Sequence, residues 1–138
     1  MKKLLVITAF VLFAGIAFGQ TLKKGSIVSI SYYEVVLQPD VTMNQYLEFM
    51  ETKYKPAFEK AFPGVKIINL KGDRGDLANK IGDMLIFDSK EIRDKYWPTQ
   101  DGETQWNEGA QELMQKMAEE LGKFQISSTR TYTDWKIL

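Results

Sequence analysis

The sequence predicts an α+β fold in which a four-stranded antiparallel sheet carries helices on one face. Residues 26–38 are rich in β-branched and aromatic side chains, which is typical of a strand. Residues 43–61 repeat apolar side chains at helical spacing. The segments then follow in the order strand, helix, strand, strand, helices, strand, which is the split βαβ arrangement. A chain of 138 residues suggests a single domain.

The first 19 residues have the pattern of a signal peptide. Two lysines precede an apolar run from Leu4 to Phe18, and Ala17 and Gly19 supply small residues for cleavage. We expect cleavage after Gly19, so that Gln20 becomes the first residue of an exported protein in the periplasm or outside the cell. The alternative is an uncleaved membrane anchor, but the apolar run is short for a span of ~20 residues.

The composition excludes several classes of function. Without the signal peptide the chain has 16 basic and 18 acidic residues, a formal charge of −2, so no nucleic-acid partner is expected. The sequence has no histidine, the commonest acid–base group near neutral pH and the commonest ligand of transition metals. It also has no cysteine, so packing rather than disulfides must hold the exported domain together. We expect no metal, no cofactor and no membrane contact after cleavage.

The first strand predicts a covered surface on both sides of the sheet. Residues 20–25 form a short polar lead-in that we expect to be flexible, and the domain proper runs from 26 to 138. Apolar residues fall on both alternating sets of the strand 26–38, which is the pattern of a strand buried on both faces. Helices can cover one face. A second copy of the chain, related by a two-fold axis, is the simplest cover for the other.

The first helix has a clear beginning and end but a proline in its interior. Thr42 and Gln45 form a capping-box pattern, and Gly64 follows the last apolar residues of the stripe. Pro56 removes a backbone hydrogen bond and clashes with the preceding turn of an α-helix. Two interpretations are open: a kink that bends the helix end over the sheet, or a boundary between two short helices.

The remaining elements follow from the same signals. We expect strands at 65–72, 81–88 and 128–138 and helices at 89–97 and 104–121, the first of these helices capped by Asp88 with Glu91 and the second opened by Thr104. The long last helix either forms a lid over a cleft or thickens the helical layer.

The acidic residues of the segment 72–83 are predicted to belong to a solvated turn. They are Asp73, Asp76 and Asp83. A calcium loop is excluded because the twelfth position counted from Asp73 is Met84 rather than a glutamate.

Two segments carry a resemblance to a known group of proteins. "YKPAFEKAFPGVKIINL" is similar to the helix end and second strand of EthD-like domains, and "MLIFDSKEIRDKYWPT" is similar to their third strand and following helix. With the order of elements, the chain resembles the dimeric α/β-barrel superfamily of ferredoxin-like fold, which includes the EthD-like, NIPSNAP-like and antibiotic-biosynthesis-monooxygenase-like domains. The resemblance implies a homodimer. Where EthD-like domains have a histidine two residues before the proline, this chain has Tyr54.

Aromatic residues are the best functional signal in the sequence. Tyrosine and tryptophan join apolar rings to polar tips, which suits a ligand cavity. Tyr32, Tyr54 and Trp135 are the predicted ligand-binding residues, because we expect each of them to face such a cavity. The alternative is that these residues are ordinary packing in the core or at a dimer contact.

The sequence therefore predicts an exported module of the dimeric α/β-barrel type that binds a small apolar or aromatic molecule or serves as a stable dimeric structural unit. The alternative is a cofactor-independent enzyme, similar to the monooxygenases or isomerases of that superfamily, that acts on an aromatic or apolar substrate. A third possibility is association with a protein of the cell envelope. No catalytic residue is identified at this level.

Overall fold

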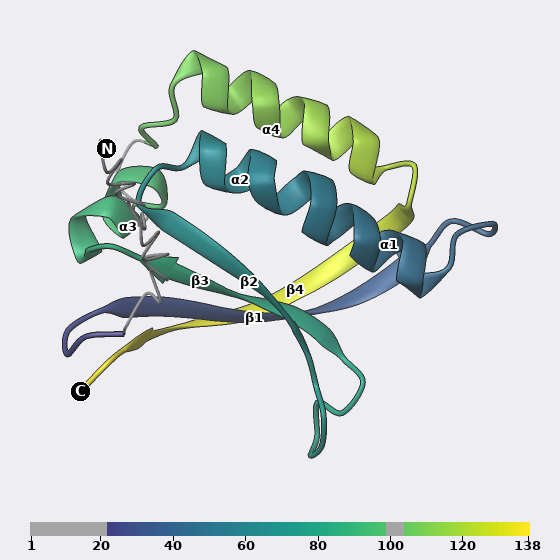
Figure 1. Ribbon diagram of the computed structural model, residues 1–138, viewed down its shortest axis with the longest axis horizontal. Coiled ribbons are helices and arrows are strands. Elements are labelled where there is room, and N and C mark those ends of the chain that lie inside the picture. Colours follow the sequence, from purple (N-terminus) through teal and green to yellow (C-terminus); the bar gives the residue numbers. More distant parts are fainter. Residues whose placement is uncertain (1–21, 99–103) are drawn as a thin grey trace, which may run out of the picture.

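The computed structural model describes residues 22–98 and 104–138 (Figure 1). The predicted signal peptide and the beginning of the lead-in lie outside these residues. The elements are β1 (Ile27–Leu37), α1 (Met43–Phe49), a π-helical segment η1 (Met50–Tyr54), α2 (Lys55–Ala61), β2 (Val65–Lys71), β3 (Ile81–Phe87), α3 (Lys90–Tyr96), α4 (Glu108–Leu121) and β4 (Gln125–Lys136).

The four strands form one antiparallel sheet in the order β2-β3-β1-β4. The first and third strands are therefore central, and each helical connection joins strands that are not sheet neighbours. Figure 1 shows α1, α2 and α4 side by side over one face of the strongly twisted sheet, with α3 at one end. This is the split βαβ topology, so the predicted ferredoxin-like fold is confirmed.

The first helical connection passes Pro56 without breaking. The capping box is present, because the Thr42 side chain accepts from the Gln45 backbone and the Gln45 side chain accepts from the Thr42 backbone. Before the proline the helix widens into a π turn, in which the Lys55 N–H donates to the Met50 carbonyl. A wider turn relieves the clash between the Pro56 ring and the carbonyl four residues earlier. The proline thus follows a local change of helical type within one continuous rod.

Three predicted boundaries were wrong by a few residues. Ser89 rather than Asp88 caps α3, since its side chain accepts from the Ile92 N–H at 3.2 Å. Asn107 rather than Thr104 caps α4, since its side chain accepts from the Ala110 N–H at 2.8 Å. The last strand begins at Gln125 instead of residue 128, because its pairing with β1 extends past a β-bulge.

The core is an aromatic cluster between the helices and the β2–β3 half of the sheet. Phe62 is fully buried. Its ring centroid lies 4.8 Å from that of Phe58, 5.2 Å from that of Tyr96 and 4.7 Å from that of Trp106. By contrast, β4 is exposed along nearly its whole length. The helical layer therefore covers the sheet unevenly and leaves room above β1 and β4.

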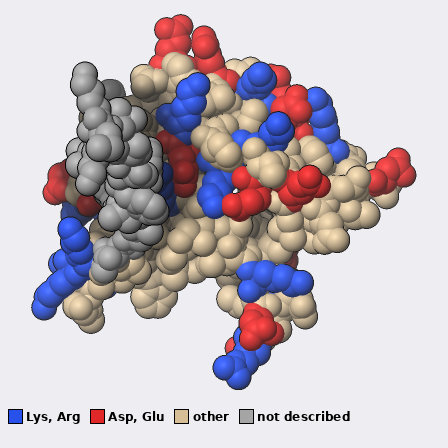
Figure 2. Space-filling model, in the orientation of Figure 1, with Lys and Arg blue, Asp and Glu red and all other residues tan. Residues whose placement is uncertain are grey.

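The opposite face of the sheet exposes large apolar side chains. They belong to the alternating set that points away from the helices, and the exposed members are Ile30 at 41%, Ile68 at 39%, Leu70 at 37%, Val36 at 54% and Trp135 at 55%. No helix of the described residues covers this open face. In Figure 2 the charged side chains gather over the helices and at the tip of the β2–β3 hairpin, and the surface between them is largely uncharged.

Candidate functional site

A cleft lies between the sheet and the helices, on the side of β1 and β4. It consists of an inner cavity of about 290 Å³ and an outer cavity of about 500 Å³. The two share four lining residues, which are Leu85, Trp97, Trp106 and Arg130. The inner cavity is at the lower end of the size range of small-molecule sites.

The inner cavity has an aromatic wall built from the helical layer. Tyr54 and Phe58 are one turn apart and stack with ring centroids at 6.1 Å, and Trp97 stacks on Phe58 at 6.0 Å. The Trp106 indole closes the same side, fixed by its Nε1–H, which donates to the Tyr96 carbonyl at 2.8 Å. A planar apolar ligand would find ring faces already in place.

A buried carboxyl group faces this aromatic wall from the floor of the cavity. Asp83 is only 5% exposed and lies on β3 opposite Ser31, on the side of the sheet that faces the helices. The Tyr33 hydroxyl donates to its Oδ2, whereas its Oδ1 is buried without a hydrogen-bond partner. Burial raises the pKa of Asp83, and the Tyr33 hydroxyl, the Arg130 charge and the Ser31 hydroxyl partly offset the rise. The predicted solvated turn is therefore wrong for Asp83.

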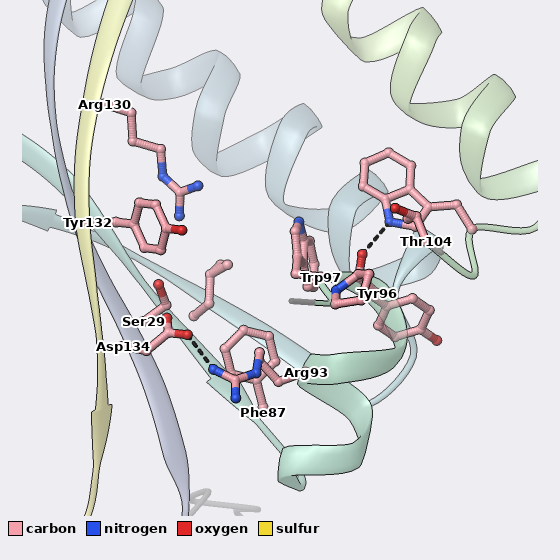
Figure 3. A pocket seen from close by; sticks show the side chains of 12 residues that line it. Ser29, Phe87, Arg93, Tyr96, Trp97, Thr104, Arg130, Tyr132 and Asp134 are labelled. Carbon is pink, nitrogen blue, oxygen red and sulfur yellow. Dashed lines mark hydrogen bonds and ion pairs between the residues drawn. The ribbon is translucent and has the colours of Figure 1, made fainter. Parts of the chain in front are cut away.

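Arg130 supplies the opposite charge from the edge strand. It lies on β4 opposite Tyr33, and its Nε–H donates to the Ser31 hydroxyl at 3.0 Å. Its guanidinium carbon is 4.6 Å from the ring centroid of Tyr132, within the range of a cation–π contact. Figure 3 shows the guanidinium extending from β4 into the space in front of Trp97. Within the described residues no ion pair joins it to any carboxylate.

The tyrosines of the cavity are hydrogen-bond donors rather than bases. Burial raises the pKa of Tyr46 to about 12. Burial first, and then the Asp83 charge, also raises the pKa values of Tyr33 and Tyr54. All three hydroxyls therefore keep their protons at neutral pH. The raised pKa of Asp83 favours the protonated, uncharged form of its carboxyl group relative to an ordinary aspartate.

The outer cavity contains a second arginine whose charge is already balanced. Arg93 on α3 pairs with Asp134 of β4 and with Asp94 on its own helix. This bridge ties α3 to the edge strand at the mouth of the cleft (Figure 3). Arg93 thus links α3 to β4. The two terminal nitrogens of Arg130, in contrast, have no hydrogen-bond partner among the described residues.

The structure separates the three predicted ligand-binding residues. Tyr54 lines the inner cavity. Tyr32 and Trp135 belong to the alternating set on the open face, on the other side of the sheet from Tyr54. The three do not share one cavity, and a binding role for each stays a prediction. Sequence reasoning missed Tyr33, Asp83 and Arg130 as site residues. The only signal for them is the alternation along their strands, which places each on the opposite face of the sheet from its neighbours in the chain.

Neither a metal cluster nor a membrane-spanning helix occurs in the part of the chain that the structure describes. Among residues 22–98 and 104–138 no three carboxylate, histidine or cysteine side chains come together in a way that could hold a metal ion. Over the same ranges, the helices are all too short or too polar to span a bilayer.

Comparison with known proteins does not assign the chain to a family. No family model and no curated protein matches the sequence. Among solved structures the chain is similar to a dimeric protein of unknown function and ferredoxin-like fold from Bacteroides fragilis, at 18% identity and a TM-score of 0.44, over 83% of this chain and 98% of the other. It is also similar to a NIPSNAP family protein of unknown function from Agrobacterium tumefaciens, at 12% identity and a TM-score of 0.47, over 83% and 91%.

Proposed function

We propose that the protein binds a small aromatic or apolar molecule in the inner cavity. One observation carries this proposal: a cavity with an aromatic wall holds a buried carboxylate oxygen that lacks a hydrogen-bond partner. Buried polar atoms are almost always paired, so an unpaired one on a residue that lines a cavity favours a ligand with a hydrogen-bond donor. The stacked rings and the hydrogen-bonded Trp106 favour a site that is formed before the ligand arrives.

Quenching of tryptophan fluorescence tests this proposal. Phenylalanine, phenethylamine, 3-phenylpropionate and 2-phenylethanol are suitable probes, because they carry the same ring with different charges. We expect at least one of them to quench the fluorescence saturably, since Trp97 and Trp106 line the cavity. Trp97→Phe should reduce the signal, whereas the matched control Trp135→Phe, which changes a tryptophan on the open face, should leave the quenching intact. Absence of saturable quenching by all four would overturn the proposal.

An enzyme remains a second candidate because of one feature, the raised pKa of Asp83 beside Tyr33. A carboxyl group oriented by a tyrosine and facing an apolar cavity is suited to move a proton within a substrate, as a cofactor-independent isomerase does. Chromatography of the probes after incubation distinguishes the two. Full recovery of an unchanged ligand supports binding alone, whereas an isomerised product that disappears with Asp83→Asn supports the enzyme.

We also propose that two copies of the chain meet through their open faces. The exposed apolar side chains of this face lie on one regular sheet surface, and apolar patches of this kind mark sites of association. The charges on this side are few, and Glu34 is paired with Lys80 at 2.7 Å. A two-fold axis would place the same surface against itself and would cover both sheets at once.

We propose in addition that the protein is exported. The apolar run after two lysines, followed by small residues up to Gly19, supports cleavage of a signal peptide. Mass spectrometry of the protein purified from the periplasm or medium should give a chain that begins at Gln20. A chain in the membrane fraction that keeps its first 19 residues would favour an uncleaved anchor instead.

A further inference from the structure

We propose that the ligand of the inner cavity is a small aromatic zwitterion, whose ammonium group binds Asp83 and whose carboxylate binds Arg130. This inference rests on the proposed function, namely that the inner cavity is a ligand site. It adds the chemical class of the ligand and assigns a separate role to each of the two charged residues.

Asp83 carries the first half of the inference. Surface charges such as those of Lys55–Glu51 and Lys80–Glu34 pair with each other at 2.7 Å. Asp83 is only 5% exposed and forms no ion pair with a described residue; Tyr33 donates to its Oδ2, and its Oδ1 has no hydrogen-bond partner. An ionised carboxylate buried in this way is costly unless a donor or a cation meets it. Asp83 lines the cavity, so a ligand ammonium group that reaches its carboxyl group can supply both.

Arg130 carries the second half. Its Nε–H is used by Ser31 and its plane lies over Tyr132, so that the fold holds the guanidinium in position. The terminal nitrogens point into the cleft and have no acceptor among the described residues (Figure 3). A fixed guanidinium with two free nitrogens matches a ligand carboxylate, which can accept from both at once.

The two charges are close neighbours that do not neutralise each other. They stand on the strands that flank β1, with Ser31 between them: Asp83 lies opposite Ser31, and Arg130 donates to its hydroxyl. The Arg130 charge lowers the pKa of Asp83, yet no ion pair within 4.0 Å joins the two side chains. Opposite charges that face one cavity without pairing leave a place for a molecule that carries both.

The remaining surface of the cavity determines the apolar part and the size of the ligand. Tyr54, Phe58 and Trp97, which stack in a row, line the same cavity as the two charged groups. These rings suit one aromatic ring of the ligand, and aromatic faces also attract the ammonium group. A volume of about 290 Å³ limits the ligand to a small molecule of the size of an aromatic amino acid.

Fluorescence titrations with the same four probes test the inference. The wild-type protein should bind phenylalanine most tightly, because only this probe carries both charges. Asp83→Asn should weaken phenylalanine and phenethylamine about 10-fold or more and leave 3-phenylpropionate nearly unchanged. Arg130→Gln should weaken phenylalanine and 3-phenylpropionate and leave phenethylamine nearly unchanged. The matched control Asp76→Asn changes an exposed aspartate of the β2–β3 loop and should alter none of the affinities.

The outcomes separate this inference from the function on which it rests. If 2-phenylethanol binds as tightly as phenylalanine, or if neither variant changes the order of the charged probes, the zwitterion is wrong and the aromatic site stands. If none of the four probes binds, both proposals fall. Thermal unfolding of each variant identifies a loss of fold, and the two variants have opposite expected patterns, which a general loss of structure cannot produce.

Discussion

At the scale of single residues, the unusual feature is a carboxyl group that the fold buries with half of its hydrogen-bonding capacity unused. Asp83 has one oxygen bonded to Tyr33 and one without a partner. Its pKa is raised, whereas the exposed carboxylates Glu34, Glu51 and Asp94 have pKa values lowered by their lysine or arginine partners. The pKa of a carboxyl group is thus lowered in the surface ion pairs and raised in the cavity.

The buried aspartate gives a prediction about stability and pH. Because its folded-state pKa lies above the unfolded value of about 3.9, the folded state binds the proton more tightly. The contribution of Asp83 is therefore fully present at low pH and is lost as the pH rises through its folded-state pKa. We expect the unfolding free energy of Asp83→Asn to rise relative to the wild type over this pH range, as measured by urea denaturation.

The matched variant Asp76→Asn isolates this effect from general changes of charge. It removes an exposed aspartate outside the cavity and changes the formal charge of the chain by the same amount. A difference between Asp83→Asn and the wild type that does not change with pH would mean that burial does not perturb this carboxyl group.

At this scale the sequence predicts the position of some site residues and not of others. Tyr54 could be found because Pro56 marks the helix end beside the cleft. The sequence predicts a solvated turn for Asp83 because it clusters with Asp73 and Asp76, although it also falls in the predicted strand 81–88, and cross-strand pairing places it inside. Tyr32 and Trp135 were assigned to a cavity, but both alternating sets of β1 are apolar, and the pattern does not tell which set faces the helices.

At the scale of elements, the predicted types and order agree with the structure, and the differences lie at the ends. Side chains that compete as caps decide these ends: serine and asparagine with extended backbones take the positions that the sequence pattern gives to Asp88 and Thr104. The start of β4 depends on a bulge in its pairing with β1, which is a non-local feature.

The capping box of the first helix gives a prediction about an element. The Thr42 hydroxyl accepts from the Gln45 N–H at 3.3 Å, and the Gln45 side chain accepts from the Thr42 N–H at 2.9 Å. Thr42→Ala removes the first of these bonds and should lower the unfolding free energy by about 1 kcal/mol. Thr42→Ser keeps the hydroxyl and should be nearly neutral. Equal losses in both variants, measured by urea denaturation, would show that the methyl group and not the cap is important.

At the scale of the whole molecule, the helical layer and the open face have different tasks. The helices form the core and the cleft on one side of the sheet, and the side that they leave uncovered exposes the apolar side chains through which we propose that two copies meet. The sequence could predict this division, because β1 carries apolar residues on both alternating sets. It could not place the cleft, since this depends on how far the helices reach over β4.

The proposed dimer gives a prediction at this scale. Ile30→Glu places a charge on the open face, where Ile30 is 41% exposed, and should shift the protein from dimer to monomer in sedimentation analysis. Glu48→Lys changes a charge on the helical side and should leave the mass unchanged. A wild-type protein that sediments as a monomer at micromolar concentration would contradict the proposal.

The π turn before Pro56 has a consequence for the orientation of the aromatic wall. A single additional residue rotates everything beyond it by roughly 100° about the axis of an α-helix. Met50–Tyr54 therefore sets the phase between the start of the rod, which is anchored by its cap, and Tyr54 and Phe58, which line the cavity. An ordinary α turn over the same residues would rotate these rings away from Asp83 about the helix axis, so the π turn at Met50–Tyr54 fixes their orientation.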